Sequence, residues 1–104
     1  MNFGIIFITS ELHYIRVVTS EGEMLILYNL YDAINELEDF YDGLQIHRSF
    51  WVVRDFINKI VKKNGTHQLQ LINNIALPIS RRRLDFVQNP LSKINDNLLM
   101  SIKK

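Results

Sequence analysis

Two short polar clusters interrupt a sequence that is otherwise rich in apolar and β-branched residues. The first is His47-Arg48-Ser49, directly before Phe50 and Trp51, and the second runs from Ser80 through three consecutive arginines to residue 83. An arginine guanidinium is a planar fork of donors that fits a phosphate or the O6 and N7 acceptors of guanine. Because three arginines at a helix start oppose the helix macrodipole, the second cluster indicates an external anion. Taken singly, each cluster also fits a solvated end of a strand or helix.

The charges of the chain are separated along its sequence. Residues 1–45 hold one basic and eight acidic residues, a net charge of −7, whereas residues 46–104 hold eleven basic and three acidic residues, a net charge of +8. Such a separation favours one face for a polyanion and another face that points away from it. The two halves of a sequence need not form two separate faces of the folded protein. The charge pattern alone therefore also fits charges that are merely solvated.

The sequence carries no motif for catalysis or metal binding. The chain of 104 residues has no cysteine, and its four glycines are scattered rather than gathered in a phosphate-binding loop. Its three histidines, His13, His47 and His67, are separated by 34 and 20 residues, a spacing that matches no metal-ligand motif. Adjacent carboxylates such as Glu38 and Asp39 face different directions on a helix, which is wrong for a paired acid and base. We therefore expect no enzyme, no cofactor and no metal.

Short alternating and β-branched segments predict a mostly β fold of antiparallel strands with short flanking helices. Residues 45–53 are interpreted as one strand that begins with polar residues, and Asn64-Gly65 is a strong hairpin signal. The other expected strands cover residues 3–9, 14–19, 24–28, 57–63, 67–72 and 75–79. The length is that of a single domain, and no apolar run approaches the ~20 residues that would cross a bilayer.

Helices are expected at three places. Residues 29–41 show an apolar stripe at helical spacing, with Asn29 as the N-cap, and their many carboxylates make this helix a poor partner for phosphate. We therefore place the acidic helix away from any nucleic acid. Ser80 is expected to cap a short helix over residues 81–87, and residues 91–104 form a marginal amphipathic helix that extends the C-terminus.

The order of these elements resembles the LytTR family of DNA-binding domains. The resemblance runs from about Phe3 to Val87 and is firmest in QIHRSFWV at 45–52 and LPISRRR at 77–83. The segment ELHYIRV at 11–17 is similar to the loop and the tyrosine-centred second strand of the family. The sequence departs from the family pattern at Val53, where asparagine is frequent, and at 73–74, where Asp-Gly is common.

The resemblance implies a cytoplasmic, sequence-specific double-stranded DNA-binding domain that regulates transcription, of the kind that serves as a response regulator output domain. In this family, loops and strand ends read the DNA, and three stretches converge on successive grooves. Carried over by position, these stretches supply His13, Tyr14, His47, Arg48, Ser49, Ser80, Arg81, Arg82 and Arg83. The expected base contacts are made by Arg48, Arg81 and either Tyr14 or His13. The expected phosphate contacts are made by the two serines and the other arginines. Family members bind paired repeats, which implies two copies per operator.

Two other functions stay open from the sequence. A protein-interaction module with a LytTR-like fold would modulate a partner regulator through the acidic helix or residues 91–104. Single-stranded RNA binding would need exposed aromatic rings on a sheet, for which Phe50 and Trp51 are the candidates. Because residues 50–52 alternate in a strand, core packing is the favoured role for Trp51.

Overall fold

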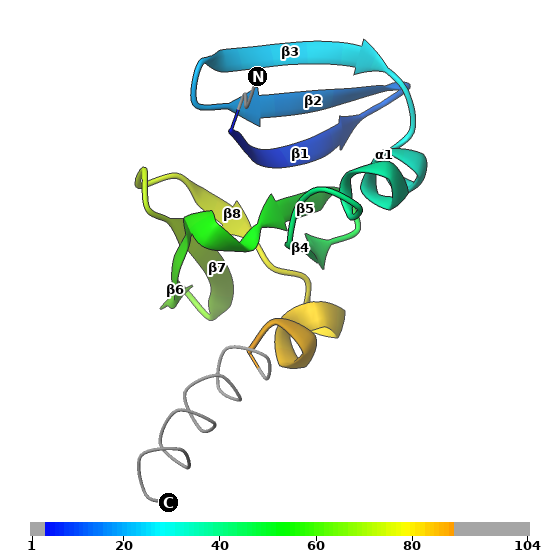
Figure 1. The fold of residues 1–104 in the computed structure, drawn as a ribbon. Coiled ribbons are helices and arrows are strands. Elements are labelled where there is room, and N and C mark those ends of the chain that lie inside the picture. Colours follow the sequence, from blue (N-terminus) through cyan, green and yellow to red (C-terminus); the bar gives the residue numbers. More distant parts are fainter. Residues whose placement is uncertain (1–3, 89–104) are drawn as a thin grey trace, which may run out of the picture.

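Two antiparallel sheets carry the fold in the computed structural model, which describes residues 4–88 (Figure 1). The larger sheet has the strand order β3-β2-β1-β5-β4, and the smaller sheet has the order β6-β7-β8. Helix α1 (Leu30–Leu37) joins β3 to β4, the 3₁₀ turn η1 (Arg54–Phe56) joins the sheets, and residues 81–88 form a further helix. The strands are β1 (Ile5–Glu11), β2 (Tyr14–Thr19), β3 (Gly22–Leu27), β4 (Gly43–His47), β5 (Phe50–Val53), β6 (Ile57–Lys63), β7 (Thr66–Leu71) and β8 (Ala76–Pro78).

The mostly β, antiparallel fold predicted from the sequence is confirmed, and the two turns of the small sheet use residues that tolerate positive φ. Asn64 and Gly65 connect β6 to β7 with φ angles of 54° and 80°, and Asn74 has a φ of 68° in the next turn. Asparagine and glycine reach this left-handed region at low cost, so these turns fix the register of the small sheet.

One sequence prediction about the strands is wrong. Residues 45–53 do not form a single strand; they contain the end of β4, the turn Arg48-Ser49 and all of β5, which together make an antiparallel hairpin. The two strands pair antiparallel, with Leu44 opposite Val52 and Gln45 opposite Trp51. The polar residues that were read as the beginning of a strand are instead the tip of the hairpin. The hairpin places Arg48 in a turn between two strands, at one end of the larger sheet.

The larger sheet contributes buried residues from both of its faces, which gives the core two layers. One face packs against α1 and forms the cluster Ile8, Ile15, Val17, Leu30, Ala33, Ile34, Trp51 and Val53. The other face packs against the small sheet through a cluster that includes Phe7, Val18, Val52, Leu69, Leu71 and Leu77. The Trp51 side chain is fully buried, as the sequence predicts. Gly43 lies flat against its indole ring, where an added Cβ would come within 1.9 Å of a ring carbon.

Helix α1 begins as predicted and ends earlier than predicted. The Asn29 side chain accepts a hydrogen bond from the Asp32 backbone N–H at 2.8 Å, which caps the first turn. The helix stops at Leu37 rather than at residue 41, and residues 38–40 form turns. Of the two residues that could complete the apolar stripe, Phe40 is 82% exposed, whereas Tyr41 is partly buried against the core cluster of α1.

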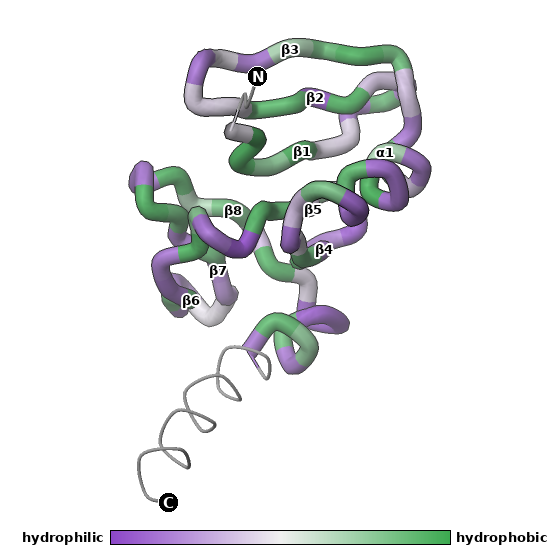
Figure 2. The backbone as a smooth tube through the Cα atoms, viewed as in Figure 1, coloured by the Kyte–Doolittle hydropathy of each residue, from purple (hydrophilic) through white to green (hydrophobic). Residues whose placement is uncertain are grey.

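The helix predicted over residues 81–87 is confirmed and reaches residue 88. In Figure 1, this helix lies on the far side of β4, away from β1, β2 and β3. Figure 2 shows that hydrophilic and hydrophobic residues follow one another along this helix and along α1. The helical extension predicted for residues 91–104 falls outside the described residues. Within residues 4–88, no helix is long and apolar enough to cross a membrane.

Candidate nucleic-acid interface

The β4–β5 turn presents Arg48 at the end of its hairpin, where the side chain is exposed. The Ser49 backbone N–H donates to His47 Nδ1 at 3.1 Å, and Gln45 Nε2 donates to the Arg48 carbonyl at 3.5 Å. The His47 ring meets the edge of the Phe50 ring, with a centroid separation of 5.7 Å. Since Nδ1 of His47 accepts a hydrogen bond, the neutral ring carries its proton on Nε2. The turn is thus held by its neighbours, and it offers a guanidinium and an imidazole donor.

The β1–β2 turn lies at the same end of the sheet. The Ser10 backbone N–H donates to the Ser49 carbonyl at 3.0 Å, directly beyond the pairing of β1 with β5. The turn itself consists of Leu12, which has a φ of 55°, and His13. His13 and Tyr14 are both exposed there. The sheet therefore brings together the first two stretches that the sequence singled out, although they lie more than thirty positions apart in the chain.

The start of the helix over residues 81–88 lies on the other side of the β4–β5 turn. The Ser80 backbone N–H donates to the Ile46 carbonyl at 3.1 Å, which ties the third stretch to β4. The helix then begins with a hydrogen bond of 3.0 Å from the Arg83 N–H to the Ser80 carbonyl. A pocket of about 720 Å³ opens between hairpin and helix, lined by His47, Arg48, Ser80, Arg82, Arg83 and Phe86. The three stretches thus form a row, with Arg48 in the middle; we call this row the candidate interface.

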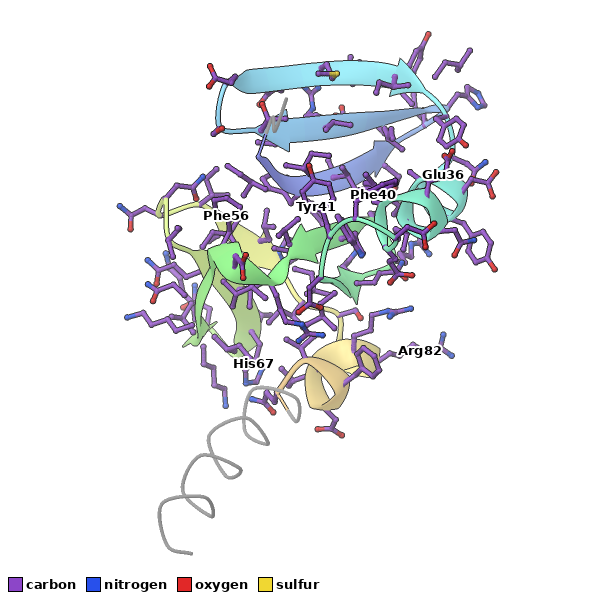
Figure 3. All side chains as sticks on the ribbon, viewed as in Figure 1. Glu36, Phe40, Tyr41, Phe56, His67 and Arg82 are labelled. Atoms are coloured by element: carbon purple, nitrogen blue, oxygen red, sulfur yellow. The ribbon has the colours of Figure 1, made fainter. Side chains whose placement is uncertain are left out.

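The three arginines of the helix occupy different positions. Arg81 and Arg82 are exposed, and Figure 3 shows Arg82 projecting from the helix. Arg83 is half-buried, and its Nη1 donates to the Gln45 carbonyl at 3.3 Å, which fastens the helix to β4. The pocket beside Arg48 is lined by Arg82 and Arg83 and not by Arg81. Of the three arginines, Arg82 and Arg83 therefore share this pocket with Arg48.

Sequence reasoning missed two residues of the candidate interface. Phe86 is 56% exposed and lines the pocket, one helical turn after Arg82. The signal in the sequence was the i, i+4 spacing of Arg82 and Phe86, because this spacing puts both side chains on one side of the helix. Gln45 was missed because it acts through two contacts: its backbone carbonyl accepts from Arg83, and its side-chain amide donates to the Arg48 carbonyl. A pattern of residue types does not predict such contacts.

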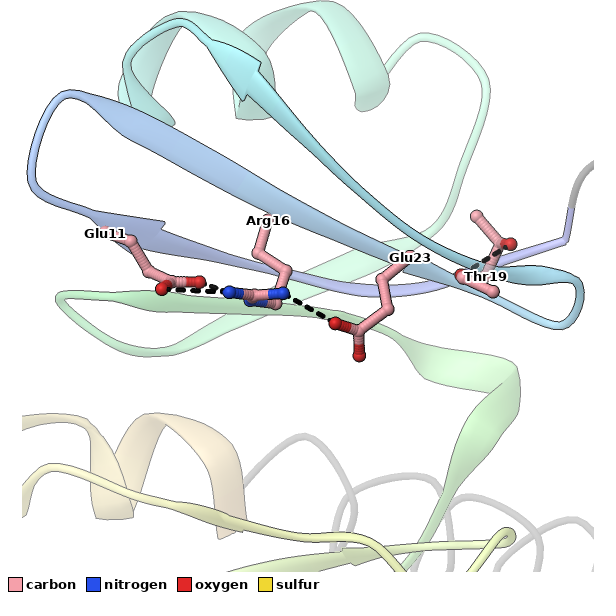
Figure 4. Close-up of polar contacts among 5 residues, drawn as sticks. Glu11, Arg16, Thr19 and Glu23 are labelled. Atoms are coloured by element: carbon pink, nitrogen blue, oxygen red, sulfur yellow. Dashed lines mark hydrogen bonds and ion pairs between the residues drawn. The ribbon is translucent and has the colours of Figure 1, made fainter.

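Acidic side chains near the candidate interface are partly neutralised within the chain. Arg16, on β2, donates to Glu11 and to Glu23, with Nη2–Oε1 and Nη1–Oε1 distances of 3.1 and 2.6 Å respectively (Figure 4). The hydrogen bonding from Arg16 to Glu11 lowers the pKa of the Glu11 carboxyl. Glu11 is the last residue before the β1–β2 turn, so Arg16 reduces the repulsion that this carboxylate would exert on a polyanion.

The acidic helix α1 is not wholly remote from the candidate interface. Its first residues, Asn29 and Leu30, share a hollow with His13 and Tyr14. The acidic residues 38 and 39 lie at its other end and line a separate hollow. The start of α1 therefore borders the β1–β2 turn, whereas residues 38 and 39 lie away from it.

The comparison with known proteins covers all of the described residues. The family model of the LytTr DNA-binding domain matches residues 4–92, a range that contains all three stretches of the candidate interface. The chain belongs to the LytTR family of DNA-binding domains. This membership gives the LytTR domain a general role in DNA binding for transcription regulation.

A solved structure supports the fold of this LytTR domain. It is the LytTr DNA-binding domain of a methyl-accepting/DNA response regulator from Bacillus cereus, with a TM-score of 0.71 and 20% sequence identity. The match covers 84% of this chain and 80% of that chain. No curated protein matches the sequence significantly.

Proposed function

We propose that this LytTR domain binds double-stranded DNA sequence-specifically, as a non-catalytic output domain that regulates transcription in the cytoplasm. The observation that carries the proposal is the row formed by the β1–β2 turn, the β4–β5 turn and the helix start. Two backbone hydrogen bonds, from Ser10 to Ser49 and from Ser80 to Ile46, hold this row together. Exposed cations and donors at one end of a sheet suit a phosphate backbone and the floor of a groove.

The proposed roles divide between bases and phosphates. Arg48, at the tip of the central hairpin, reads a guanine, and Arg81 and either His13 or Tyr14 read bases in the adjoining grooves. Phosphates are bound by Ser49, Ser80 and Arg82, with the His47 imidazole beside them. Arg83 contributes mainly by holding the helix start in place, because its guanidinium already binds a carbonyl of β4.

Two copies of the domain would occupy one operator, as the family resemblance implies. The test is selection of bound duplexes from a random pool, followed by titration of the selected duplex at several salt concentrations. We expect the selected duplexes to share two related short sequences, and the affinity to fall steeply between about 50 and about 200 mM salt through counterion release. Selected duplexes without any shared sequence would refute sequence-specific reading. An affinity that does not change with salt concentration would argue against phosphate contacts and favour a protein-interaction module.

A matched pair of variants connects the test to the candidate interface. Arg48→Ala and Lys62→Ala each remove one exposed cation, but Lys62 lies on β6 in the other sheet. Arg48→Ala should cost ~1–3 kcal/mol on the selected duplex and relax the preference at one base position. Lys62→Ala should change neither quantity beyond a small uniform effect of net charge.

A further inference from the structure

The two sheets have four outer edges, and three of them are protected in ways that proteins commonly use. The β4 edge is covered by the chain itself, through the hydrogen bonds from Ser80 and Arg83 to β4 carbonyls. The β6 edge carries exposed lysines at 59, 62 and 63, and β8 ends in the exposed Pro78. Lysines, proline and a covering segment all discourage the pairing of one sheet edge with another.

The fourth edge, β3, has none of these protections within the described residues. All six residues of β3 are exposed, and no charge or proline interrupts the run from Met24 to Tyr28. Exposed fractions in this run are 47% for Met24, 54% for Leu25 and 69% for Leu27. Figure 2 shows the same run as a hydrophobic stretch along the outermost strand of the sheet. A long apolar edge strand with free backbone groups is a template for another strand.

Both faces of β3 are apolar. Met24 and Ile26 lie on the α1 face, because they pair with Val17 and Ile15 of β2. Leu25 and Leu27 alternate with them and lie on the opposite face. On the α1 face, an apolar groove of about 500 Å³ runs between β3 and the helix, and the exposed Phe40 lines it. The stretch available for contact is therefore wider than the strand alone.

The charged and polar groups that flank this run are already satisfied within the chain. Glu23 accepts a hydrogen bond from Arg16 at 2.6 Å, and the Tyr28 hydroxyl donates to Glu36 at 2.5 Å. The middle of β3 therefore requires no charged partner, and its complement is an uncharged apolar strand. The chain itself contains such a strand on its surface, namely β3.

We propose that β3 is an edge at which two copies of this chain pair antiparallel, joining their two larger sheets into one. A two-fold axis perpendicular to the sheet keeps the α1 faces of both copies on one side, so residues of the same face meet across the new ladder. With the axis at Leu25, Met24 of one copy lies opposite Ile26 of the other. Apolar side chains then meet on both faces, and Glu23 lies outside the centre.

This pairing is independent of DNA binding in its geometry. Tyr14 pairs with Leu27, so the candidate interface lies towards the end of β3 away from Gly22. An antiparallel pair places the candidate interfaces of the two copies at opposite ends of the joined sheet. Pairing through β3 is therefore a different contact from the binding of two copies to one operator, and it does not depend on that binding.

The first test is the molar mass in solution as a function of concentration. Sedimentation equilibrium from about 10 μM to about 1 mM should show the mass rising from 12.3 kDa towards twice that value, as expected for a small interface. Leu25→Lys should abolish the rise. Ile72→Lys is the matched control, because Ile72 is an isoleucine of similar exposure, 58%, outside β3. A wild-type chain that stays monomeric throughout would overturn the proposal, as would a Leu25→Lys variant that dimerises like the wild type.

A second test does not depend on the folding of the lysine variant. The sequence has no cysteine, so single substitutions at Met24, Leu25, Ile26 and Leu27 each introduce one thiol. Residues that face their own copies across a two-fold antiparallel ladder have Cα atoms about 4.5–5.5 Å apart, within reach of a disulfide. Oxidation should give a sharp maximum of cross-linked dimer at one central position, and Ile72→Cys should give little. Equal cross-linking at all four positions, or none at any, would contradict the antiparallel pairing.

Discussion

The contact between Arg83 and β4 predicts that this arginine supports DNA binding without touching DNA. Arg83→Ala removes a single hydrogen bond of 3.3 Å from a half-buried guanidinium to the Gln45 carbonyl. Hydrogen bonds from charged donors contribute up to about 3 kcal/mol, but this one is long and partly solvated, so we expect a loss of about 1 kcal/mol in the free energy of unfolding. The loosened helix start should weaken binding to every duplex by a similar factor.

Urea unfolding and salt-dependent binding together distinguish this role from a phosphate contact. If Arg83 positions the helix, the variant has a lower unfolding midpoint and an unchanged slope of log affinity against log salt concentration. If Arg83 binds a phosphate, the slope falls by about one and the midpoint is unchanged. Arg82→Ala is the control, since Arg82 is exposed and should lower the slope without affecting stability. An Arg83→Ala variant of wild-type stability with a reduced slope would refute the positioning role.

Three further predictions follow from single features of the fold. Gly43→Ala should lower the free energy of unfolding by ~1–3 kcal/mol or more, measured by urea titration, because its Cβ would overlap a buried ring. The Glu11–Arg16 interaction should stabilise the protein above a pH of about 4.5, the ordinary pKa of this carboxyl, and this contribution should be lost as the pH falls through the lowered pKa of the folded state. Glu11→Gln should therefore flatten the dependence of the urea midpoint on pH in that range. Charge-neutral changes at Glu38 and Asp39 should leave operator affinity unchanged or slightly higher, and a clear loss in a binding titration would place that end of the helix at the DNA.

Local signals predicted much of the fold. The hairpin at Asn64-Gly65 and the helix cap at Asn29 depend on residues close together in the sequence. Residue propensity and spacing were therefore sufficient to predict both. The β4–β5 hairpin was missed because its turn, Arg48-Ser49, has neither glycine nor asparagine. That turn is stabilised by contacts with other elements, including the Ser10 N–H on β1, and sequence spacing does not reveal such contacts.

The resemblance to the family implied the residues of the candidate site and the convergence of the three stretches, but not how the stretches are held together. Two arginine-containing clusters and a histidine–tyrosine pair were recognisable by their residue types and by resemblance to the family. Their order in space was not, because it depends on hydrogen bonds between backbone groups far apart in sequence. The distinction between Arg82 and Arg83 was equally hidden, since it depends on which arginine reaches a carbonyl of β4.

The most direct test of the central claim compares Arg48→Ala with Lys62→Ala on the selected duplex and on a scrambled duplex of the same length. If the row of three stretches reads DNA through Arg48, Arg48→Ala loses ~1–3 kcal/mol on the selected duplex and much less on the scrambled one. Lys62→Ala should retain the discrimination of the wild-type chain between the two duplexes. An equal loss on both duplexes for Arg48→Ala would reassign Arg48 to a phosphate, and an unchanged affinity would contradict the proposed interface.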